Sequence, residues 1–414
     1  MEKKQRIVIT GMGTLNAVAG NVPEFTKALQ DGACGIETVD LFDTAGCRCR
    51  NGGQVKRFNP HECIPSTFSM KRTSRADRLC LAATLEALRD AGLYPLTQGV
   101  REDMGIAIGG GSGGLLEAES FYADVMKKGS GKARFSTLAS VYCASSADFI
   151  ASQLGLFGPK ITLMTACSAG GTVLGYGRDM IRNGQAAFMI AGGVEPMCKI
   201  TYTSFNALKS LDPDICRPFD KNRQGLSLGE AAAIMILEPL EMALYRGARI
   251  YGEILGYGVT CDSHHMTAPD EQGSGAARSM AAALQDSGIS IDDIDYINAH
   301  GTATLVNDVM ETKAIKAVFG KRAYEIPVSS TKAMTGHTLA AAGALEGIVS
   351  ILAMVHSFIP PTIHHRDPDP LCDLDYVSEG ERRADVRAVL SNSFAFGGNN
   401  TTVIFGRYDE GCPA

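Results

Sequence analysis

The chain has 414 residues, of which 45% are hydrophobic and 20% charged, and its formal net charge at pH 7 is -6. This length exceeds the size at which one hydrophobic core usually stops growing, so we expect two core units. The acidic balance and the lack of a dense Lys/Arg block exclude nucleic acid as an expected partner.

The first residues and the cysteines indicate a compartment. The start, MEKKQRIVITGMG, has too short an apolar stretch for a signal peptide, and no later segment offers the uninterrupted apolar run of a membrane span. We therefore expect a cytoplasmic protein that makes no membrane contact. The 12 cysteines are scattered, form no CxxC pair and would stay reduced there. Cys47 and Cys49 form only a CxC, so we expect no zinc site.

Strand-like and helix-like segments alternate along the chain. Apolar runs typical of buried strands, many of them next to a glycine, occur at residues 6–13, 104–111, 161–168, 186–193, 231–238, 294–301, 326–332, 387–393 and 401–406. Helical apolar spacing fills many of the intervals, as in residues 77–92 and 275–288. This alternation predicts an α/β fold with central sheets covered on both faces. We divide the chain into an N-terminal half, 1–253, and a C-terminal half, 254–414.

Cys167 is the first residue that suggests chemistry. It lies in ITLMTACSAGGTVLGYGRDMI, where a strand ends near Met164 and a helix begins just beyond the cysteine. A thiol there faces the positive end of the helix dipole and unpaired backbone N–H groups, which favour the thiolate. Its small neighbours would let a substrate chain approach closely. A buried structural cysteine is the alternative, and this position alone does not exclude it.

Two histidines occupy similar positions at strand ends. His300 lies in DYINAHGTAT, and His337 lies between a strand and an alanine-rich helix in SSTKAMTGHTLAAAGALEGI. Either histidine alone could be structural, but with Cys167 they form a Cys-His-His set suited to nucleophilic catalysis. The histidine pairs at 264–265 and 364–365 lack acidic or cysteine partners at ligand spacing, so we interpret them as loop residues.

Motifs for bound nucleotides are incomplete. Gly11 and Gly13 form a GxG after a strand, but Asn16 stands at the third glycine position of a dinucleotide-binding fingerprint. The run GGGSGG at residues 109–114 lacks an adjacent lysine for phosphate, and the chain contains no GxxxxGK[ST] sequence. These motifs therefore predict no nucleotide cofactor.

Five ordered motifs point to one family. TACSAGG, RPFDKNRQGLSLGE, NAHGTAT, STKAMTGHTLAAAG and NSFAFGGNN resemble the signature segments of β-ketoacyl-[acyl-carrier-protein] synthase II and its type II polyketide ketosynthase relatives. The resemblance implies the thiolase fold, in which two pseudo-twofold related α/β halves form α-β-α-β-α layers. It implies acyl transfer from an acyl carrier protein and decarboxylative Claisen condensation with malonyl carrier protein. No cofactor is implied beyond the 4'-phosphopantetheine of the carrier.

The resemblance assigns the central roles. Cys167 would accept the acyl chain, and His300 and His337 would assist decarboxylation of the malonyl group. The backbone N–H groups of Cys167 and Phe396 would form an oxyanion hole, and the side chain of Phe396 would act as a gate. These residue types suit the chemistry, because a thiolate exchanges readily with thioesters and paired N–H donors stabilise an oxyanion.

The same resemblance places a buried ion pair beside the histidines. Lys332 would lie next to the second histidine, with Glu311 as its acidic partner. A lysine and a glutamate in the interior would pair to avoid an uncompensated charge. In the same segment, NDVMETKAIK, we expect Asp308 and Lys313 to lie on a solvated helix face.

Other positions are carried over from the family in the same way. Thr302 and Thr304 match the threonines that bind the pantetheine arm. The positions that dock the acidic carrier protein in relatives correspond to Lys71, Arg72, Arg75 and Lys209. A structural cation, present in some relatives, would be held by Asn298, Glu346, Ser391 and Asn392.

The chain departs from the family pattern near the substrate. Ala395 replaces a glycine of the gate turn, which would stiffen the gate, and GEAAA at 229–233 fills space that glycines usually leave. Ser112, Thr137 and Leu226 stand where bulkier or aromatic side chains are common. Together they predict a roomier or more polar pocket, and hence an acyl group that is long, unsaturated or ketone-bearing.

Several functions are compatible with these motifs to different degrees. Fatty-acid elongation is the leading hypothesis, and a type II polyketide or polyene synthase is the alternative. Besides acyl carrier protein, the partner would be an identical subunit, or a chain-length factor in the polyketide case. The retained Cys167 argues against a non-catalytic chain-length factor and against a malonyl decarboxylase. The turn SFAFGGNN lacks the second cysteine that a degradative thiolase would use.

Overall fold

The computed structural model describes residues 5–409, whose framework is a ten-stranded mixed sheet in the order β10-β9-β13-β14-β8-β1-β7-β6-β4-β5. The strands of the N-terminal half are β1 (Ile7–Leu15), β4 (Met104–Gly110), β5 (Lys160–Leu163), β6 (Phe188–Glu195) and β7 (Ala231–Pro239). Those of the C-terminal half are β8 (Gly252–Cys261), β9 (Tyr296–Asn298), β10 (Val328–Ser329), β13 (Ala388–Ala395) and β14 (Asn399–Gly406).

The two halves repeat one topology. Counted within each half, the strand order from the shared centre outward is 1-5-4-2-3 in both. The directions also match, because the first two pairings of each half are antiparallel and the last two are parallel. The halves join where β1 pairs with β8 through Val8–Glu253 and Ile9–Gly252. The division after residue 253 that the sequence suggested lies at the start of β8.

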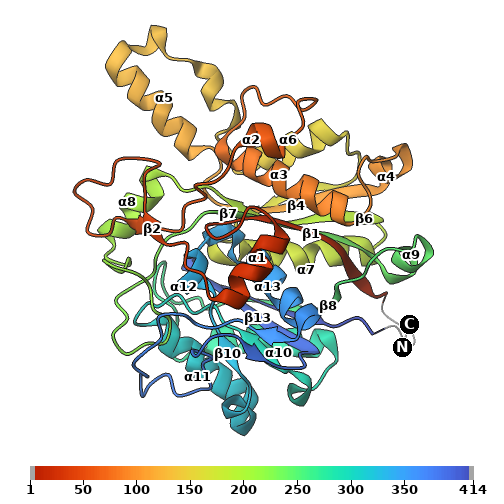
Figure 1. Ribbon diagram of the computed structural model, residues 1–414, viewed down its shortest axis with the longest axis vertical. Coiled ribbons are helices and arrows are strands. Elements are labelled where there is room, and N and C mark those ends of the chain that lie inside the picture. Colours follow the sequence, from red (N-terminus) through yellow and green to blue (C-terminus); the bar gives the residue numbers. More distant parts are fainter. Residues whose placement is uncertain (1–4, 410–414) are drawn as a thin grey trace.

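Helices cover the sheet in layers. On the outer face of the N-terminal half lie α3 (Arg75–Asp90) and α6 (Ser145–Leu154), and on that of the C-terminal half lie α10 (Ser274–Ser287) and α11 (Asn307–Phe319). Between the halves, α7 (Ala169–Arg182) packs against α13 (Ala342–His356) (Figure 1). The structure therefore has the α-β-α-β-α layering that the sequence predicted.

The remaining elements are short or peripheral. They are α1 (Val22–Asp31), β2 (Glu37–Thr38), β3 (Asn51–Gly52), α2 (Pro60–Cys63), α4 (Gln98–Asp103), α5 (Leu115–Lys128), η1 (Ser130–Lys132), η2 (Phe135–Ser140), η3 (Ala166–Ser168), α8 (Lys199–Ala207), α9 (Leu240–Tyr245), η4 (Ile291–Asp293), η5 (Gly320–Tyr324), α12 (Lys332–Thr335), η6 (Leu339–Ala341), β11 (Phe358–Ile359), β12 (Arg382–Arg383) and η7 (Phe396–Gly398).

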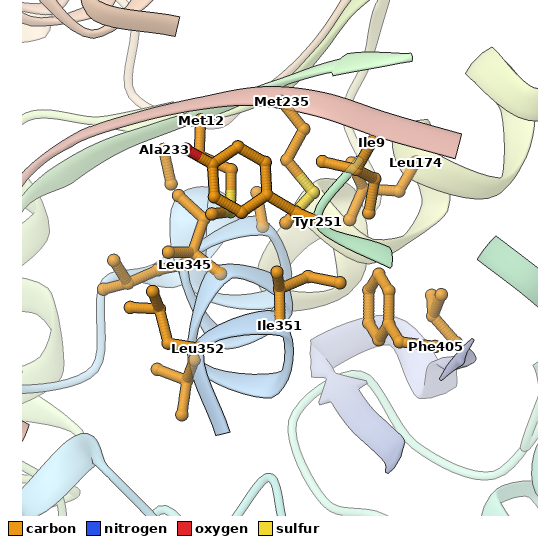
Figure 2. Close-up of a cluster of buried hydrophobic side chains, with 14 of the residues drawn as sticks. Ile9, Met12, Leu174, Ala233, Met235, Tyr251, Leu345, Ile351, Leu352 and Phe405 are labelled. Carbon is orange, nitrogen blue, oxygen red and sulfur yellow. The ribbon is translucent and has the colours of Figure 1, made fainter. Parts of the chain in front are cut away.

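One hydrophobic core joins the two halves. Figure 2 shows side chains from β1 and β7 of the first half meeting Leu345, Ile351 and Leu352 of α13 and Phe405 of β14 from the second. All of these side chains are at most 2% exposed. The sheet faces that point toward α7 and α13 are therefore buried only when both halves are present.

The stretch Leu339–His356 has the length and apolar composition of a membrane span, with a mean hydropathy of 1.7, so the expectation that no segment has such a run is wrong. In the structure 83% of it is buried inside the protein. Its apolar character is explained by its position, since α13 is enclosed by α7 and by strands of both halves. A helix buried on all sides is apolar all round.

Gly11 and Gly13, the GxG of the first strand, serve packing. A Cβ at Gly11 would lie 2.2 Å from the carbonyl oxygen of Ala87, and one at Gly13 would lie 2.0 Å from that of Ala83. Both oxygens belong to α3, so the glycines let this helix lie directly on β1. A capping box between Ser74 and Asp77 fixes where α3 begins.

Helix α5 and the segment that follows it extend away from the body of the molecule (Figure 1). The α5 arm, residues 115–142, carries large apolar side chains that are more than 60% exposed, namely Tyr122, Met126, Phe135 and Tyr142. Phe157 and Met164, on either side of the edge strand β5, are exposed to a similar degree. Exposed apolar groups gathered around an edge strand are typical of a surface that another chain covers.

Candidate active site

The site lies where parallel strands of both halves end. Cys167 follows β5, His300 follows β9, and His337 follows β10 by way of α12. A cavity of about 300 Å³ opens at this place and is lined by all three residues. The carboxyl ends of parallel strands are where α/β proteins usually bind ligands. The structure thus brings together the three residues that the sequence singled out.

Cys167 lies in η3, directly before α7, and is 7% exposed. Ala166 before it has φ 49°, a left-handed conformation that is uncommon for a residue with a side chain and marks a constrained turn. Burial raises the pKa of the Cys167 thiol to about 12, although Lys332 and the backbone N–H groups of Phe396 and Cys167 oppose the shift. The thiolate expected from the helix position is therefore not the resting form, and the thiol is neutral at pH 7.

His300 and His337 face each other. Their ring centroids are 5.2 Å apart with the planes at 85°, and each residue is 2% exposed. Burial and the charge of Lys332 lower the pKa of both well below 6.5, so both imidazoles are neutral at pH 7. Within residues 5–409, the buried Nδ1 atom of each has no hydrogen-bond partner. A neutral imidazole with a proton on Nε2 can donate a hydrogen bond into the cavity.

Lys332 pairs with Glu346, and the predicted pairing with Glu311 is wrong. The Nζ atom of Lys332 contacts Glu346 Oε1, and the two side chains are 2% and 4% exposed. Glu311 has another task, because its oxygens accept hydrogen bonds from the backbone N–H groups of His300 and Gly301, each at 2.8 Å. Burial raises the pKa of both Glu311 and Glu346 to about 7. Glu311 therefore positions the turn that carries His300.

Two of the four residues assigned to a cation have a free oxygen. Asn298 Oδ1 and Glu346 Oε2 are buried and lack a hydrogen-bond partner in the described part of the chain. Both lie near Tyr296, whose hydroxyl accepts a bond from Asn298 and whose pKa is raised by burial and also by the charge of Glu346. Ser391 pairs with Asn298 along the β13–β9 ladder. The amide of Asn392 is already occupied, since it donates one hydrogen bond and accepts another.

Phe396 closes one side of the cavity. Its ring stacks on Phe205 of α8, with centroids 5.6 Å apart and planes 12° from parallel. Its backbone N–H lies within hydrogen-bonding reach of the Cys167 sulfur. The next residue, Gly397, has φ 78°, which favours glycine. Ala395 has φ -137° and ψ 156°, an extended conformation open to any residue, so it causes no strain in this closed state.

A second loop holds the gate turn. Asn400 Nδ2 donates to Asp262 Oδ1 at 2.6 Å, and the backbone N–H of Asp262 donates to the carbonyl oxygen of Gly398 at 2.9 Å. The N–H of Gly397 donates to the carbonyl oxygen of Met266 at 2.8 Å. Movement of this turn therefore requires these hydrogen bonds to break or the two loops to move together.

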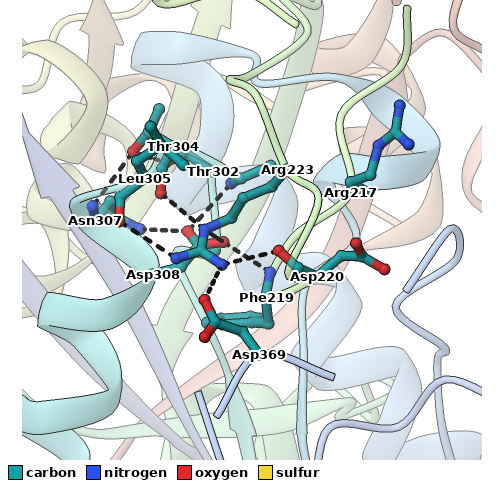
Figure 3. A network of polar contacts seen from close by, with 12 residues as sticks. Arg217, Phe219, Asp220, Arg223, Thr302, Thr304, Leu305, Asn307, Asp308 and Asp369 are labelled. Carbon is teal, nitrogen blue, oxygen red and sulfur yellow. Dashed lines mark hydrogen bonds and ion pairs between the residues drawn. The ribbon is translucent and has the colours of Figure 1, made fainter. Parts of the chain in front are cut away.

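Thr302 and Thr304 line the cavity, and their hydroxyl oxygens are 3.1 Å apart. Arg223 holds their loop from behind, since its guanidinium donates to the carbonyl oxygens of Thr304 and Leu305, each at 3.3 Å (Figure 3). The same guanidinium forms an ion pair with Asp369 at 2.5 Å. The RPFDKNRQGLSLGE motif therefore supports the predicted pantetheine-binding threonines through Arg223.

Asp308 belongs to this network, and the prediction that it lies on a solvated helix face is wrong. Its side chain is fully buried and accepts hydrogen bonds from the backbone N–H groups of Ala303, at 3.1 Å, and Phe219, at 2.7 Å. Arg223 lies 3.7 Å from its other side and compensates the charge (Figure 3). Lys313, on the other face of α11, is exposed as expected.

The three residues that differ from the family pattern near the substrate lie in different places. Leu226 lines the cavity and is buried. Ser112 is buried and does not line the cavity, and its hydroxyl lies 3.2 Å from that of Thr201. Thr137 lies in η2 on the α5 arm and is half-buried, away from the cavity lining.

The four basic residues that were predicted to dock the carrier protein also have different surroundings. Lys209 is exposed at the mouth of the cavity, and Lys71 and Arg72 are exposed before α3. Arg75 differs from these three, because its guanidinium forms two hydrogen bonds with the buried carboxylate of Glu230, at 2.9 and 2.5 Å. Its side chain is 18% exposed and that of Glu230 is 0% exposed. Arg75 therefore takes part in a structural ion pair, and its contact with a carrier protein stays a prediction.

Comparison with known families follows the same division as the sheet. The profile described as Beta-ketoacyl synthase, N-terminal domain, matches residues 4–243, and that of the C-terminal domain matches residues 251–366. The chain belongs to the β-ketoacyl synthase family. This synthase is 40% identical over 416 residues to 3-oxoacyl-[acyl-carrier-protein] synthase 2 of Synechocystis sp., with 98% of the chain and 99% of the relative aligned.

Solved structures resemble the synthase over nearly its whole length. The ishigamide ketosynthase/chain length factor matches with a TM-score of 0.94 and 37% identity, covering 98% of this chain and 100% of the other. A type II polyketide ketosynthase in complex with its acyl carrier protein and bound to a hexaketide matches with a TM-score of 0.88 and 30% identity, over the same shares of each chain. The thiolase fold and the acyltransferase class predicted from the motifs are confirmed by these matches.

Two residues that support the site went unnoticed in the sequence. Arg223 was contained in a motif but received no role. Glu195, the last residue of β6, is 1% exposed and accepts hydrogen bonds from Ser112 and Ala340. An acidic residue that ends the apolar run AAFMIAGGVE was the available signal, since it stands at the carboxyl end of a strand where ligands bind.

Proposed function

We propose that this synthase transfers an acyl chain from an acyl carrier protein to Cys167 and condenses it with malonyl carrier protein, giving 3-oxoacyl carrier protein, CO2 and free carrier. One observation carries the proposal: a single cavity holds the thiol of Cys167, two neutral imidazoles and the backbone N–H of Phe396. Fatty-acid elongation is the proposed pathway, because the Synechocystis relative named 3-oxoacyl-[acyl-carrier-protein] synthase 2 aligns over its full length.

In the first step the Cys167 sulfur attacks the carbonyl carbon of the carrier thioester. A C–S bond to Cys167 forms and the C–S bond to the pantetheine breaks, and the thiol proton passes to the departing pantetheine sulfur. Lys332 and the N–H of Phe396, which oppose the high pKa of the thiol, favour the negative charge that develops on the sulfur.

In the second step the malonyl group loses CO2. The electron pair of the broken C–C bond moves into an enolate on the thioester, and the Nε2–H groups of His300 and His337 stabilise its oxygen. The enolate carbon then attacks the acyl carbon on Cys167, while the N–H groups of Cys167 and Phe396 hold the resulting oxyanion. Collapse of that intermediate expels the Cys167 thiolate, which takes a proton from water.

The carrier arm has a continuous path to the nucleophile. The pantetheine would lie along Thr302, Thr304 and Leu226, all of which line the cavity. Lys209 stands at its mouth, and with Lys71 and Arg72 would attract an acidic carrier protein. We place this reaction in the cytoplasm.

The proposed reaction needs no resident cofactor, because both acyl groups arrive covalently bound to the carrier. A structural cation would be held by Asn298 and Glu346, whose unpaired buried oxygens suit a hard cation. It would stabilise the charge of Glu346 and hence the position of Lys332. The side chain of Asn392 would not take part.

A second subunit would cover the α5 arm and the edge strand β5. We propose a homodimer, since the exposed apolar side chains Tyr122, Phe135, Tyr142 and Met164 are more numerous than a monomer of this kind needs to expose. Sedimentation of the purified chain tests this proposal. A sedimenting mass of twice 43.9 kDa is expected, and a monomer would point instead to a different partner chain.

A type II polyketide or polyene ketosynthase is the second candidate. The structural matches to the ishigamide ketosynthase/chain length factor and to a ketosynthase bound to a hexaketide favour it. In that case the α5 arm would contact a chain-length factor in place of an identical subunit.

Mass spectrometry of the intact protein tests the reaction. Incubation with saturated acyl carrier protein thioesters should add one acyl mass to the wild type and none to Cys167→Ala. His300→Ala and His337→Ala should still form the adduct, but release of 3-oxoacyl carrier protein should fall by about 10²–10³-fold, since each removes one donor to the enolate.

Cys261→Ala is the matched control, because it removes an exposed thiol and should be acylated like the wild type. An adduct in Cys167→Ala, or wild-type condensation by either histidine variant, would contradict the proposal. Acylation only by unsaturated or ketone-bearing donors would move the enzyme to the second candidate.

A further inference from the structure

Glu195 and Glu311 each bind the turn after the second strand of their half, but from different elements, since Glu195 ends β6 and Glu311 lies in α11. Glu311 accepts the backbone N–H groups of His300 and Gly301 in the turn after β9. Glu195 accepts the N–H of Ser112 at 2.8 Å, together with that of the preceding glycine, in the turn after β4. Since β4 and β9 are the second strands of their halves, Ser112 is the counterpart of His300, two residues beyond the strand in each case.

The hydroxyl of Ser112 belongs to a small polar group. It lies 3.2 Å from the hydroxyl of Thr201, which also accepts a hydrogen bond from the thiol of Cys198 at 3.1 Å. Each hydroxyl has one proton to donate and two positions to accept, so the pair keeps hydrogen-bonding capacity after these contacts. The sequence around Ser112, GGSGG, fits the GxSxG pattern of hydrolase nucleophiles, but the hydroxyl faces a threonine and not a histidine base.

The hydroxyl pair is linked to the cavity of the reactive cysteine through helix α8. Thr201 stands one helical turn before Phe205 on α8, hence on the same face, and Phe205 lines the cavity and stacks on Phe396. Glu195, which binds Ser112, is also close enough for its charge to act on Cys167. An acyl chain attached to Cys167 would reach the pair by extending past Phe396 once that side chain moves.

We propose that Ser112 and Thr201 select acyl chains that carry an oxygen substituent, a ketone or a hydroxyl, and that Glu195 positions Ser112 for this contact. The inference rests on the proposed acylation of Cys167. An oxygen on the chain exchanges hydrogen bonds with the pair, whereas a saturated chain covers both hydroxyls without replacing their contacts with water. Sites built to bind a polar group discriminate strongly against analogues that lack it.

Acylation rates of Cys167 in the full-length enzyme test this selection. The donors are octanoyl carrier protein and a series of octanoyl carrier proteins with one hydroxyl or one ketone at different carbons. The wild type should accept at least one oxygenated donor about tenfold faster than octanoyl. Thr201→Val, which keeps the side-chain shape, and Ser112→Ala should each reduce that preference to about twofold or less.

Thr203→Val on the same helix is the matched control, because the Thr203 hydroxyl bonds only the carbonyl oxygens of Lys199 and Ile200. It should keep the wild-type preference. Equal rates for all donors in the wild type, or a preference unchanged in both Thr201→Val and Ser112→Ala, would overturn the inference. Failure of every donor to acylate the wild type would instead overturn the proposed function, so the two failures are distinct.

The proposal that Glu195 positions Ser112 is tested with a separate variant. Glu195→Gln keeps the size of the side chain but cannot accept the N–H groups of Ser112 and its neighbour with both oxygens. The preference for the oxygenated donor should fall while acylation by octanoyl persists. A retained preference would exclude the positioning role. If this variant does not fold, Glu195→Asp, which withdraws the carboxylate from Ser112, gives the same comparison.

Discussion

Cys167, His300 and His337 share an interior in which Lys332 acts on all three. Desolvation raises the pKa of the thiol and lowers those of the imidazoles, so burial leaves each group neutral at pH 7. This arrangement suits a reaction whose charges appear and vanish within the cavity. The neutral imidazoles can donate to an enolate, and the thiol brings the proton that the departing pantetheine sulfur requires.

The pKa of Cys167, near 12, predicts how its alkylation by iodoacetamide depends on pH. Only the thiolate reacts, and its fraction grows about tenfold per pH unit as long as the pH is below the pKa. Labelling of Cys167, followed by peptide mass spectrometry, should therefore keep rising from pH 6 to pH 9 without a plateau. Lys332→Met should slow it further, because Lys332 is the strongest influence that lowers this pKa. A plateau below pH 8 would contradict the prediction.

In the proposed reaction the turn η7 would separate the acyl chain from the carrier arm. It combines Gly397, whose positive φ fixes a bend, with the extended Ala395 and the stacked ring of Phe396. Hydrogen bonds to the loop around Asp262 and Met266 hold the turn in the closed state. Its motion is therefore limited by backbone freedom as well as by side-chain contacts.

Ala395→Gly should loosen the gate. The substitution fits the closed backbone but widens the conformations open to the turn, a change of roughly 0.5–1 kcal/mol. Acylation of Cys167 should accelerate about two- to fivefold, and the melting temperature should fall slightly. Ala133→Gly, in the extended backbone of the α5 arm, is the control and should leave acylation unchanged. Identical acylation rates in both variants would show that backbone freedom does not limit opening.

Arg75, at the start of α3, and Lys209 should respond differently to substitution. Arg75→Ala should destabilise the protein by about 3–5 kcal/mol, because the carboxylate of Glu230 stays buried without its partner. Lys209→Ala should instead raise the KM for acyl carrier protein and leave stability unchanged. Chemical denaturation and steady-state kinetics separate the two effects. Restored stability in Arg75→Met combined with Glu230→Gln would confirm the pair, whereas weaker carrier binding by Arg75→Ala without destabilisation would contradict it.

Taken as a whole, the molecule shows which features follow from sequence. The meeting of Cys167 and His300, which follow the ends of β5 and β9, was predictable, because strand ends in α/β proteins converge on one edge. The partner of Lys332 was not, since Glu311 and Glu346 both lie in helices and only the packing of α13 brings Glu346 to the lysine. Asp308 likewise appears solvated on α11 until Arg223, from a distant loop, covers it.

The stability of the whole molecule should fall as the pH rises through 7. Four interior carboxyl groups have pKa values raised from 4.5 to about 7, those of Glu86, Glu195, Glu311 and Glu346. Above pH 6.5 the folded state binds more protons at these groups than the unfolded chain, so the free energy of unfolding decreases with pH until they have ionised. The buried histidines oppose this only below pH 6.5, where the unfolded chain takes up protons.

Melting temperatures measured from pH 6.5 to pH 8 should therefore decline. Glu86→Gln should flatten the decline, because this residue lies outside the active site and accepts hydrogen bonds from the backbone of Val22 and Thr14. A melting temperature that rises over this range would show that the carboxyl groups ionise in the folded state well below pH 7.

The repeated strand order has a consequence for ancestry. Two halves with one topology, joined by a short β1–β8 ladder and a shared core, are what fusion of two copies of a half-length gene would leave. The acidic residue that binds the turn after the second strand comes from a different element in each half, since Glu195 ends β6 whereas Glu311 lies in α11. One copy came to hold His300 in that turn and the other Ser112, so duplication freed one turn for chemistry while the other could vary with the substrate.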